Sequence, residues 1–175
     1  FVQIVTRLRP TPSIMVRPGH GLAFSLTYHP AFGVPYSLDV DLQLSGLDMQ
    51  MQVDGRALYT PHTLVLGTSW TSTRVTLALD VAWAMWSQMG SPFVRVQTRI
   101  QQVGLLTASH PRLPMNDSVA VRLGLEATAM STSTLCLLVR TGYGYESPVV
   151  GAQSGRSNVF DGHKHTIGLG LGTVW

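Results

Sequence analysis

The sequence predicts an all-β chain that forms an antiparallel, up-and-down transmembrane β-barrel, with about seven strands of a larger barrel present. Three observations predict this class: long runs of alternating side chains, a low charge content, and connections that alternate between short and long. In residues 36–45 every second side chain is apolar, and the side chains between them are Ser37, Asp39, Asp41, Gln43 and Ser45. Successive side chains of a β-strand point to opposite faces, so this run indicates a strand with one apolar and one polar face.

Two further runs repeat the pattern. Residues 74–86 alternate from Val75 to Met85, and residues 118–127 alternate from Val119 to Ala127, with charged side chains in the polar set of each run. A soluble sandwich can contain one such strand. A whole chain of them, with ionised groups on the polar faces, is typical of a transmembrane barrel.

The composition agrees with strands that span a membrane. The chain is 45% hydrophobic and only 12% charged, whereas about 25% charged residues is usual for soluble domains. The mean hydropathy is +0.18, yet no stretch approaches the ~20 apolar residues that a membrane helix needs. The net charge of +3 rests on arginine, because Lys164 is the only lysine. Guanidinium groups in a lumen or at lipid headgroups account for this preference, and so does a plain bias towards arginine.

The turns between alternating runs place the strands in order. We expect strands at residues 21–28, 36–45, 63–70, 74–86, 118–127, 134–145 and 164–175. The connections 29–35, 71–73 and 128–133 are short, and the connections 46–62, 87–117 and 146–163 are long. Outer-membrane barrels have short periplasmic turns and longer extracellular loops, so this alternation gives every strand a direction and sends the last strand towards the periplasm.

Two segments lie outside this scheme. Residues 93–103 also alternate, but one more membrane strand would break the up-down order, so we expect an extension of the 74–86 strand beyond the membrane, kinked at Gly90 and Pro92. Residues 1–18, with three prolines, are expected to be the end of a preceding strand and a loop. Residues 19–175 then form the C-terminal strands of the barrel. The first residues show no basic segment followed by an apolar one, as a signal peptide would have. Either a signal peptide was removed or the start of the protein is missing, and we expect the second.

The last strand carries its own signal. Ile167, Leu169 and Leu171 share one face with the terminal Trp175, and an alternating strand that ends in an aromatic residue is similar to the signal read by barrel-assembly machinery. The opposite face is Gly168, Gly170 and Gly172. These glycines would let another element approach closely, or they form a tightly coiled strand. Aromatic residues also gather near other strand ends, as in the belts of membrane proteins: Tyr28, Tyr36, Trp70, Trp83, Tyr143 and Tyr145.

The polar faces supply the candidate functional residues. The barrel directs seven side chains towards its lumen: Asp39, Asp41, Asp80, Trp86, Arg122, Glu126 and Arg140. We expect the charges inside because a charge facing lipid would cost about 2–4 kcal/mol at mid-depth. They meet a substrate carboxylate or a plug residue, or they form a structural ladder of ion pairs. Trp86, near the extracellular end, either lines an apolar groove or packs as an ordinary belt residue.

Other chemistries find little support, and we expect no enzyme activity, metal site or cofactor. The sequence has no nucleophile elbow, glycine-rich phosphate loop, zinc-type histidine motif or paired cysteine motif. His163 and His165 share one face, but no third ligand is evident. Cys136 is the only cysteine, so an internal disulfide is impossible. The basic residues alternate with acids instead of clustering, which argues against nucleic-acid binding.

Three stretches resemble one family of outer-membrane transporters. The first is Gly19-His20-Gly21-Leu22-Ala23-Phe24 through Tyr28-His29-Pro30, and the second runs from Tyr59-Thr60-Pro61 to Trp83-Ala84-Met85-Trp86-Ser87. The most specific stretch contains Asn116-Asp117-Ser118, Val121-Arg122-Leu123-Gly124, Arg140-Thr141-Gly142-Tyr143-Gly144-Tyr145-Glu146-Ser147-Pro148 and Asp161-Gly162-His163-Lys164-His165. In order and spacing they are similar to the C-terminal half of the FadL/TodX-type transporters for long-chain fatty acids and aromatic hydrocarbons.

The resemblance implies a bacterial outer-membrane barrel, monomeric when complete, with about twice the strands seen here. It also implies an N-terminal plug and passive uptake of hydrophobic small molecules. The plug and the gating residues of that family lie in the half that has no positions in this sequence. Outer-membrane lipids and barrel-assembly machinery are the other partners implied.

Two other classes remain open. A structural or adhesive outer-membrane barrel would bind partners through its long loops, such as 87–117. A soluble lipid-carrying barrel would turn the apolar faces inward and place the Asp and Arg side chains in water. We expect the 175-residue chain alone to aggregate or to close wrongly, because an open sheet leaves unpaired edges and a lipid-facing surface.

Overall fold

The computed structural model describes residues 8–44, 47–89, 95–100, 104–108, 115–151 and 161–175. Across these residues the chain forms eleven β-strands and one short 3₁₀ turn, with no α-helix. The strands make two antiparallel sheets, which confirms the all-β, antiparallel class. No helix in this part of the chain is both long and apolar enough to cross a membrane.

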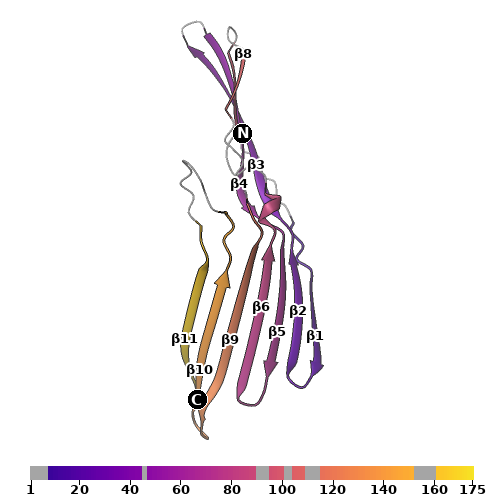
Figure 1. Ribbon diagram of the computed structural model, residues 1–175, viewed down its shortest axis with the longest axis vertical. Helices are drawn as coiled ribbons and strands as arrows, with labels where there is room; N and C mark the ends of the chain where they lie inside the picture. The colour runs from indigo at the N-terminus through magenta and orange to yellow at the C-terminus, as the bar shows by residue number, and fades with distance from the viewer. Residues whose placement is uncertain (1–7, 45–46, 90–94, 101–103, 109–114, 152–160) are drawn as a thin grey trace.

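The larger sheet has seven strands and curls into an open half-barrel (Figure 1). Its strands, in spatial order, are β1 (Ser13–Gly19), β2 (Leu22–His29), β5 (Thr63–Thr71), β6 (Val75–Ala84), β9 (Ser118–Ser131), β10 (Cys136–Glu146) and β11 (Lys164–Val174). Six of them overlap expected strands. The seventh, β1, lies mostly within residues 1–18, for which the end of a preceding strand and a loop were expected. Pro18 is compatible with β1 because β1 is an edge strand, where a missing N–H breaks no ladder.

The smaller sheet has four strands and extends beyond one end of the half-barrel (Figure 1). Its order is β3 (Phe32–Leu44), β4 (Leu47–Thr60), β7 (Arg95–Ile100) and β8 (Gly104–Ala108). The prediction of a strand at 36–45 is therefore right, but its place in the larger sheet is wrong. The long loop predicted at 46–62 is also wrong, because most of it is β4.

The two sheets are linked by one long hairpin. The β2–β5 pairing ends at His29↔Thr63, and the β3–β4 pairing continues in the same register at Phe32↔Thr60. β3 thus extends β2 in the same direction, and the short turn predicted at 29–35 is wrong. The register slips once, at Leu58, which has a φ of 51°. The extra residue of this bulge reverses which residues of β4 lie on each face relative to β5, because a shift of one residue exchanges the two faces of a strand.

The tight turns of the larger sheet lie together at the end where the chain terminates (Figure 1). They join β1 to β2, β5 to β6 and β9 to β10. In the first turn, His20 and its two flanking glycines have positive φ, and a Cβ added at Gly21 would lie 1.9 Å from the Thr71 carbonyl oxygen. Only glycine fits that position. The long connections all leave the opposite end of the sheet.

Residues 93–103 are described only at 95–100, which form β7; Gly90, Pro92 and the rest of the segment lie outside the described residues. β7 does not join the larger sheet, yet it is not an extension of β6 either. A 3₁₀ turn at Trp86–Gln88 follows β6, and β7 pairs with β4 in the smaller sheet. Periodicity identified a strand here but contained no information about its partner.

The register sorts the larger sheet into two faces. One row of cross-strand partners is Ile14–Leu26–Leu66–Val81–Val121–Tyr145–His165, and the next row on the opposite side is Met15–Ser25–Gly67–Asp80–Arg122–Gly144–Thr166. We call these the apolar face and the polar face. No other described element covers the apolar face, whose exposed side chains include Ile14, Phe24, Leu66, Trp70, Trp83, Leu123, Ile167, Leu169 and Leu171. Within the described ranges only Pro61, Ser118 and Val150 are buried.

Candidate functional site

The polar face of the larger sheet carries four of the seven predicted site residues: Asp80, Arg122, Glu126 and Arg140. Asp80 and Arg122 are cross-strand partners, and four residues further along β9 Glu126 is the partner of Arg140. Between these two rows lies a row of small residues, namely Ser69, Ala78, Gly124, Gly142 and Gly168. The alternation of the sequence predicted this grouping across β6, β9 and β10.

Glu126 and Arg140 form an ion pair. The Arg140 Nε donates to Glu126 Oε2 at 2.5 Å. The Arg140 side chain also covers glycines of β11, because a Cβ added at Gly170 would lie 3.5 Å from the Arg140 Cβ and one at Gly172 would lie 3.7 Å from its Nη1. The space above these two glycines is thus partly filled by Arg140.

Asp80 of β6 and Arg122 of β9 are cross-strand partners but form no ion pair. The Asp80 carboxylate lies over Gly67 of β5, where an added Cβ would be 2.8 Å from Asp80 Oδ1. Arg122 leans the other way, and a Cβ added at Gly144 of β10 would be 4.0 Å from Arg122 Cγ. Each charged side chain therefore occupies the space above a glycine on its far neighbour, and the two charges diverge.

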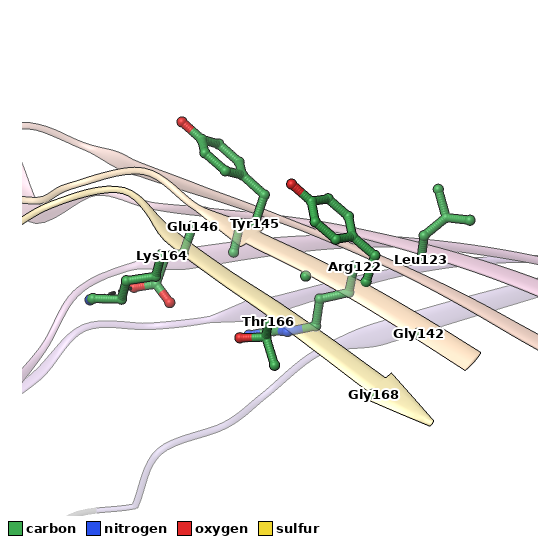
Figure 2. Close-up of a pocket in the computed structure, with 11 residues that line it drawn as sticks. Arg122, Leu123, Gly142, Tyr145, Glu146, Lys164, Thr166 and Gly168 are labelled. Atoms are coloured by element: carbon green, nitrogen blue, oxygen red, sulfur yellow. Dashed lines mark hydrogen bonds and ion pairs between the residues drawn. The ribbon is translucent and has the colours of Figure 1, made fainter. Parts of the chain in front are cut away.

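A hollow of about 390 Å³ lies beside Arg122, on the polar face of β9, β10 and β11. Figure 2 shows Arg122, Glu146, Lys164 and Thr166 on one side of the strands, with Tyr145 and Leu123 on the other. Glycines form its floor: Gly142, Gly144 and Gly168 all line it. A Cβ at Gly168 would meet nothing within 4 Å, so the hollow is open at that point.

Glu146 and Lys164 line the end of the hollow nearest the long connections, and Asp161 lies beside Lys164. Lys164 Nζ lies 3.4 Å from Glu146 Oε1 and 3.7 Å from Asp161 Oδ1. Asp161 Oδ2 in turn accepts from the backbone N–H of Val149 at 2.5 Å and of Val150 at 3.1 Å. Burial alone would raise the pKa of Asp161, but the N–H groups of Val150, Val149 and Gly162, together with Lys164, outweigh it and lower that pKa.

A second carboxylate holds the chain between β6 and β9. Asp117 Oδ1 accepts from the Ser87 backbone N–H at 3.0 Å. The Ser87 hydroxyl and N–H, with a smaller contribution from Trp83, lower the pKa of Asp117 against the effect of burial. Next to it, Ser118 is 5% exposed. Asp117 and Asp161 were quoted within the motifs of the resemblance, but neither was given a structural role. No local pattern identifies these contacts, because their backbone partners lie 11 to 30 residues away in the sequence, at Ser87, Val149 and Val150.

Asp39 and Asp41 lie elsewhere. They belong to β3 in the smaller sheet, where Asp39 pairs with Gln52 and Asp41 with Gln50. Together with Gln97 and Arg99 they line a separate hollow of about 340 Å³. The prediction that they share a wall with Asp80 and Arg122 is wrong, because β3 pairs with β4 and with no strand of the larger sheet.

Trp86 is also displaced from the predicted face. β6 ends at Ala84, and Trp86 begins the 3₁₀ turn that follows. Its ring lies 6.0 Å from that of Tyr59, whose other contact is the Arg56 guanidinium at 5.4 Å. The alternation of residues 74–86 therefore stops two residues before the tryptophan, and Trp86 packs near the junction of the two sheets.

Histidines pair with tyrosines at the end of the apolar face nearest the long connections, and the sequence analysis did not predict these pairs. Tyr143 and His165 share a hydrogen bond of 2.8 Å, Tyr145 and His163 share another of 2.8 Å, and the Tyr145 and His165 rings lie 5.4 Å apart. On β2, Tyr28 bonds to His62 at 2.6 Å. The two-residue spacing of His163 and His165 was the available signal. In the described part of the chain, no three His, Cys, Asp or Glu side chains are grouped as a metal ion requires.

No family model matches the chain, and no curated protein matches it.

Proposed function

We propose that this chain forms part of a bacterial outer-membrane β-barrel that carries hydrophobic molecules, such as long-chain fatty acids or aromatic hydrocarbons, passively across the membrane. The observation that supports it best is the sorting of side chains by the register of the larger sheet. Most of its exposed apolar side chains line one face, with Met15 and Val174 as exceptions, and its charged side chains line the other. A lipid-facing wall needs this arrangement, because charges are costly in hydrocarbon and apolar side chains are not.

The dimensions of the sheet support the same proposal. The strands β6, β10 and β11 have 10, 11 and 11 residues, and a tilted membrane strand needs about 9–11. On the apolar face, aromatic side chains lie near both ends of the strands: Tyr28, Trp83 and Tyr145 towards the long connections, and Trp70 towards the tight turns. Such rings sit at the headgroup level on each side of a bilayer.

The polar face would form the wall of a lumen. Asp80, Arg122, Glu126 and Arg140 then line the passage, and the apolar face meets outer-membrane lipids. A closed barrel needs further strands between β1 and β11, which are the edges of the sheet that the described residues form. We propose that they belong to a longer protein of the FadL/TodX type, inserted by barrel-assembly machinery and monomeric when complete.

A second candidate is a structural or adhesive barrel. The observation in its favour is the smaller sheet, which extends β2 and β5 beyond the half-barrel on the side of the long connections (Figure 1). Such an extension offers a surface to partners outside the cell.

The test begins with the native polypeptide extracted from outer membranes and run on a gel with and without heating. The transporter proposal expects a heat-shifted band much larger than 19.0 kDa and a loss of labelled long-chain fatty acid or toluene uptake when the gene is deleted. A heat-shifted band near 19.0 kDa with unchanged uptake would favour the adhesive barrel. The absence of any membrane-associated band would contradict both.

A further inference from the structure

We propose that Arg122 binds a carboxylate in the hollow of the polar face, which makes this hollow an anion site and not only a stretch of wall. The proposal deepens the proposed function, and it rests on that function for the statement that the hollow faces a lumen. The carboxylate comes from a hydrophobic acid in transit or from an Asp or Glu side chain of another segment of the protein.

The pairing of charges on the polar face points to Arg122. Arg140 is neutralised by Glu126 at 2.5 Å, and Lys164 is held by Glu146 and Asp161. Asp80 is the cross-strand partner of Arg122, yet its carboxylate lies over Gly67 on the far side of β6. Among the described residues of the hollow, Arg122 is therefore the cation without an acceptor. A guanidinium offers a planar fork of donors that matches a carboxylate.

The shape of the hollow suits the same ligand. Arg122 and Thr166 flank the position of Gly144, where an added Cβ would lie 4.0 Å from Arg122 Cγ and 3.7 Å from Thr166 Cβ. Beyond them the floor consists of Gly142 and Gly168, and the row of small residues continues across the sheet through Gly124 and Ala78. A carboxylate at Arg122 could thus be followed by an unbranched chain lying along a floor without projecting side chains.

Binding measurements on the full-length protein in detergent test the proposal with two probes of equal length, dodecanoate and dodecanol. For a hydrophobic acid in transit, Arg122→Gln is expected to weaken dodecanoate binding about tenfold or more, since charge-assisted hydrogen bonds are lost. Dodecanol binding should be unchanged. Arg122→Lys should fall between, because it keeps the charge and loses the fork. Arg74→Gln, the same substitution outside the hollow, is the matched control and should change neither. Gly168→Leu fills open space and should weaken both probes.

Thermal unfolding of the same variants tests the other source of the carboxylate. If an acidic side chain of the protein occupies the site, Arg122→Gln leaves dodecanoate binding unchanged and lowers the melting temperature at pH 7 but not at pH 3, where carboxylates are protonated. Arg74→Gln should lower it at neither pH. Unchanged binding together with unchanged melting at both pH values would overturn the proposal. A wild-type protein that binds neither probe and mediates no uptake would contradict the transport function, whereas the melting comparison would still decide whether Arg122 holds a carboxylate.

Discussion

Among the described carboxylates, Asp161 accepts hydrogen bonds from three backbone N–H groups, more than any other. Its carboxylate accepts from the N–H groups of Val149, Val150 and Gly162 and lies near Lys164. Val150 is one of the few buried residues of the described chain, so this carboxylate fixes the path of the chain after β10. Hydrogen bonds to a charged group contribute about 1.5–3 kcal/mol.

We predict that Asp161→Asn destabilises the protein at pH 7, by roughly 1–3 kcal/mol. The folded pKa of Asp161 is below its usual value, so its stabilisation is complete above about pH 5 and is lost as the pH falls through the folded pKa. The gap between wild type and variant in urea unfolding, measured in detergent, should therefore close on acidification. Asp39→Asn, at an exposed site, is the control. A gap that widened towards low pH would contradict the prediction.

The Glu126–Arg140 pair should contribute little despite its short distance. The two side chains are 39% and 56% exposed, and exposed ion pairs are generally worth about 0–1 kcal/mol. We expect Glu126→Gln to change the free energy of unfolding by less than about 1 kcal/mol. Urea titration at low and high salt is the measurement, and a loss several times larger would mean that the pair is shielded from solvent.

At this scale the sequence allowed about half of the site to be predicted. Alternation was enough to place Asp80, Arg122, Glu126 and Arg140 on one face. It could not predict that Asp80 and Arg122 diverge, because this depends on Gly67 and Gly144 being their neighbours on β5 and β10. That neighbourhood is a property of the register, and the register is set by turns and bulges far from these residues.

At the scale of the elements, the register of the long hairpin from β2 to β5 shifts at one residue, Leu58. Leu58 has a φ of 51° and is 78% exposed, so its side chain contributes little packing while its backbone is strained. We predict that Leu58→Gly leaves stability unchanged or raises it by about 0.5–1 kcal/mol, because glycine adopts positive φ without a steric cost. Thermal unfolding of the folded protein in detergent measures the difference.

Deletion of Leu58 should have the opposite effect. Without the bulge, the apolar side chains Met49, Met51 and Val53 would exchange faces with Gln50, Gln52 and Asp54 relative to β5. We expect the deletion variant to lose its heat-modifiable, folded form on gels. A deletion variant as stable as Leu58→Gly would show that the bulge does not determine the faces of β4.

The elements that were predicted wrongly share a cause. β4 alternates through Met49, Met51 and Val53, but its position between two expected membrane strands favoured a loop. β1 contains Pro18, and the connection between β2 and β3 contains Pro30, and proline usually signals a turn. In the structure, Pro18 lies in the edge strand of the larger sheet. Pro30 lies where β2 leaves the larger sheet and continues as β3 in the smaller sheet. Alternation predicts that a strand exists, but not which strand it pairs with.

For the whole molecule, the membrane proposal makes a prediction about which face tolerates charge. Leu66 is 53% exposed on the apolar face. Ala82 of β6 follows Val81, the cross-strand partner of Leu66, and therefore lies on the polar face. In lipid, Leu66→Arg should cost about 2–4 kcal/mol, and Ala82→Arg should cost much less because it enters a polar lumen. Folding yields into lipid vesicles measure this, and equal yields for the two variants would contradict the proposed orientation.

The edges of the larger sheet make a second prediction at this scale. In the described part of the chain, β1 and β11 each have one edge that pairs with no other strand, and Leu169 of β11 is 85% exposed. The 175-residue chain expressed alone should therefore aggregate in buffer, because open edges and an uncovered apolar face both promote association. Size-exclusion chromatography with light scattering is the measurement, and a soluble monomer would contradict the prediction.

The unbroken register from Leu22↔Trp70 to Gly33↔Tyr59 also has a consequence for how the chain folds. β2 and β5 are far apart in sequence, and closing such a distance directly would be slow. The β3–β4 hairpin removes the difficulty, because pairing that begins near its tip can advance residue by residue until β2 meets β5. The part of the molecule that extends farthest from the half-barrel can thus serve as the starting point of its folding. As pairing advances towards β2 and β5, the register shifts by one residue at a single point, the bulge at Leu58.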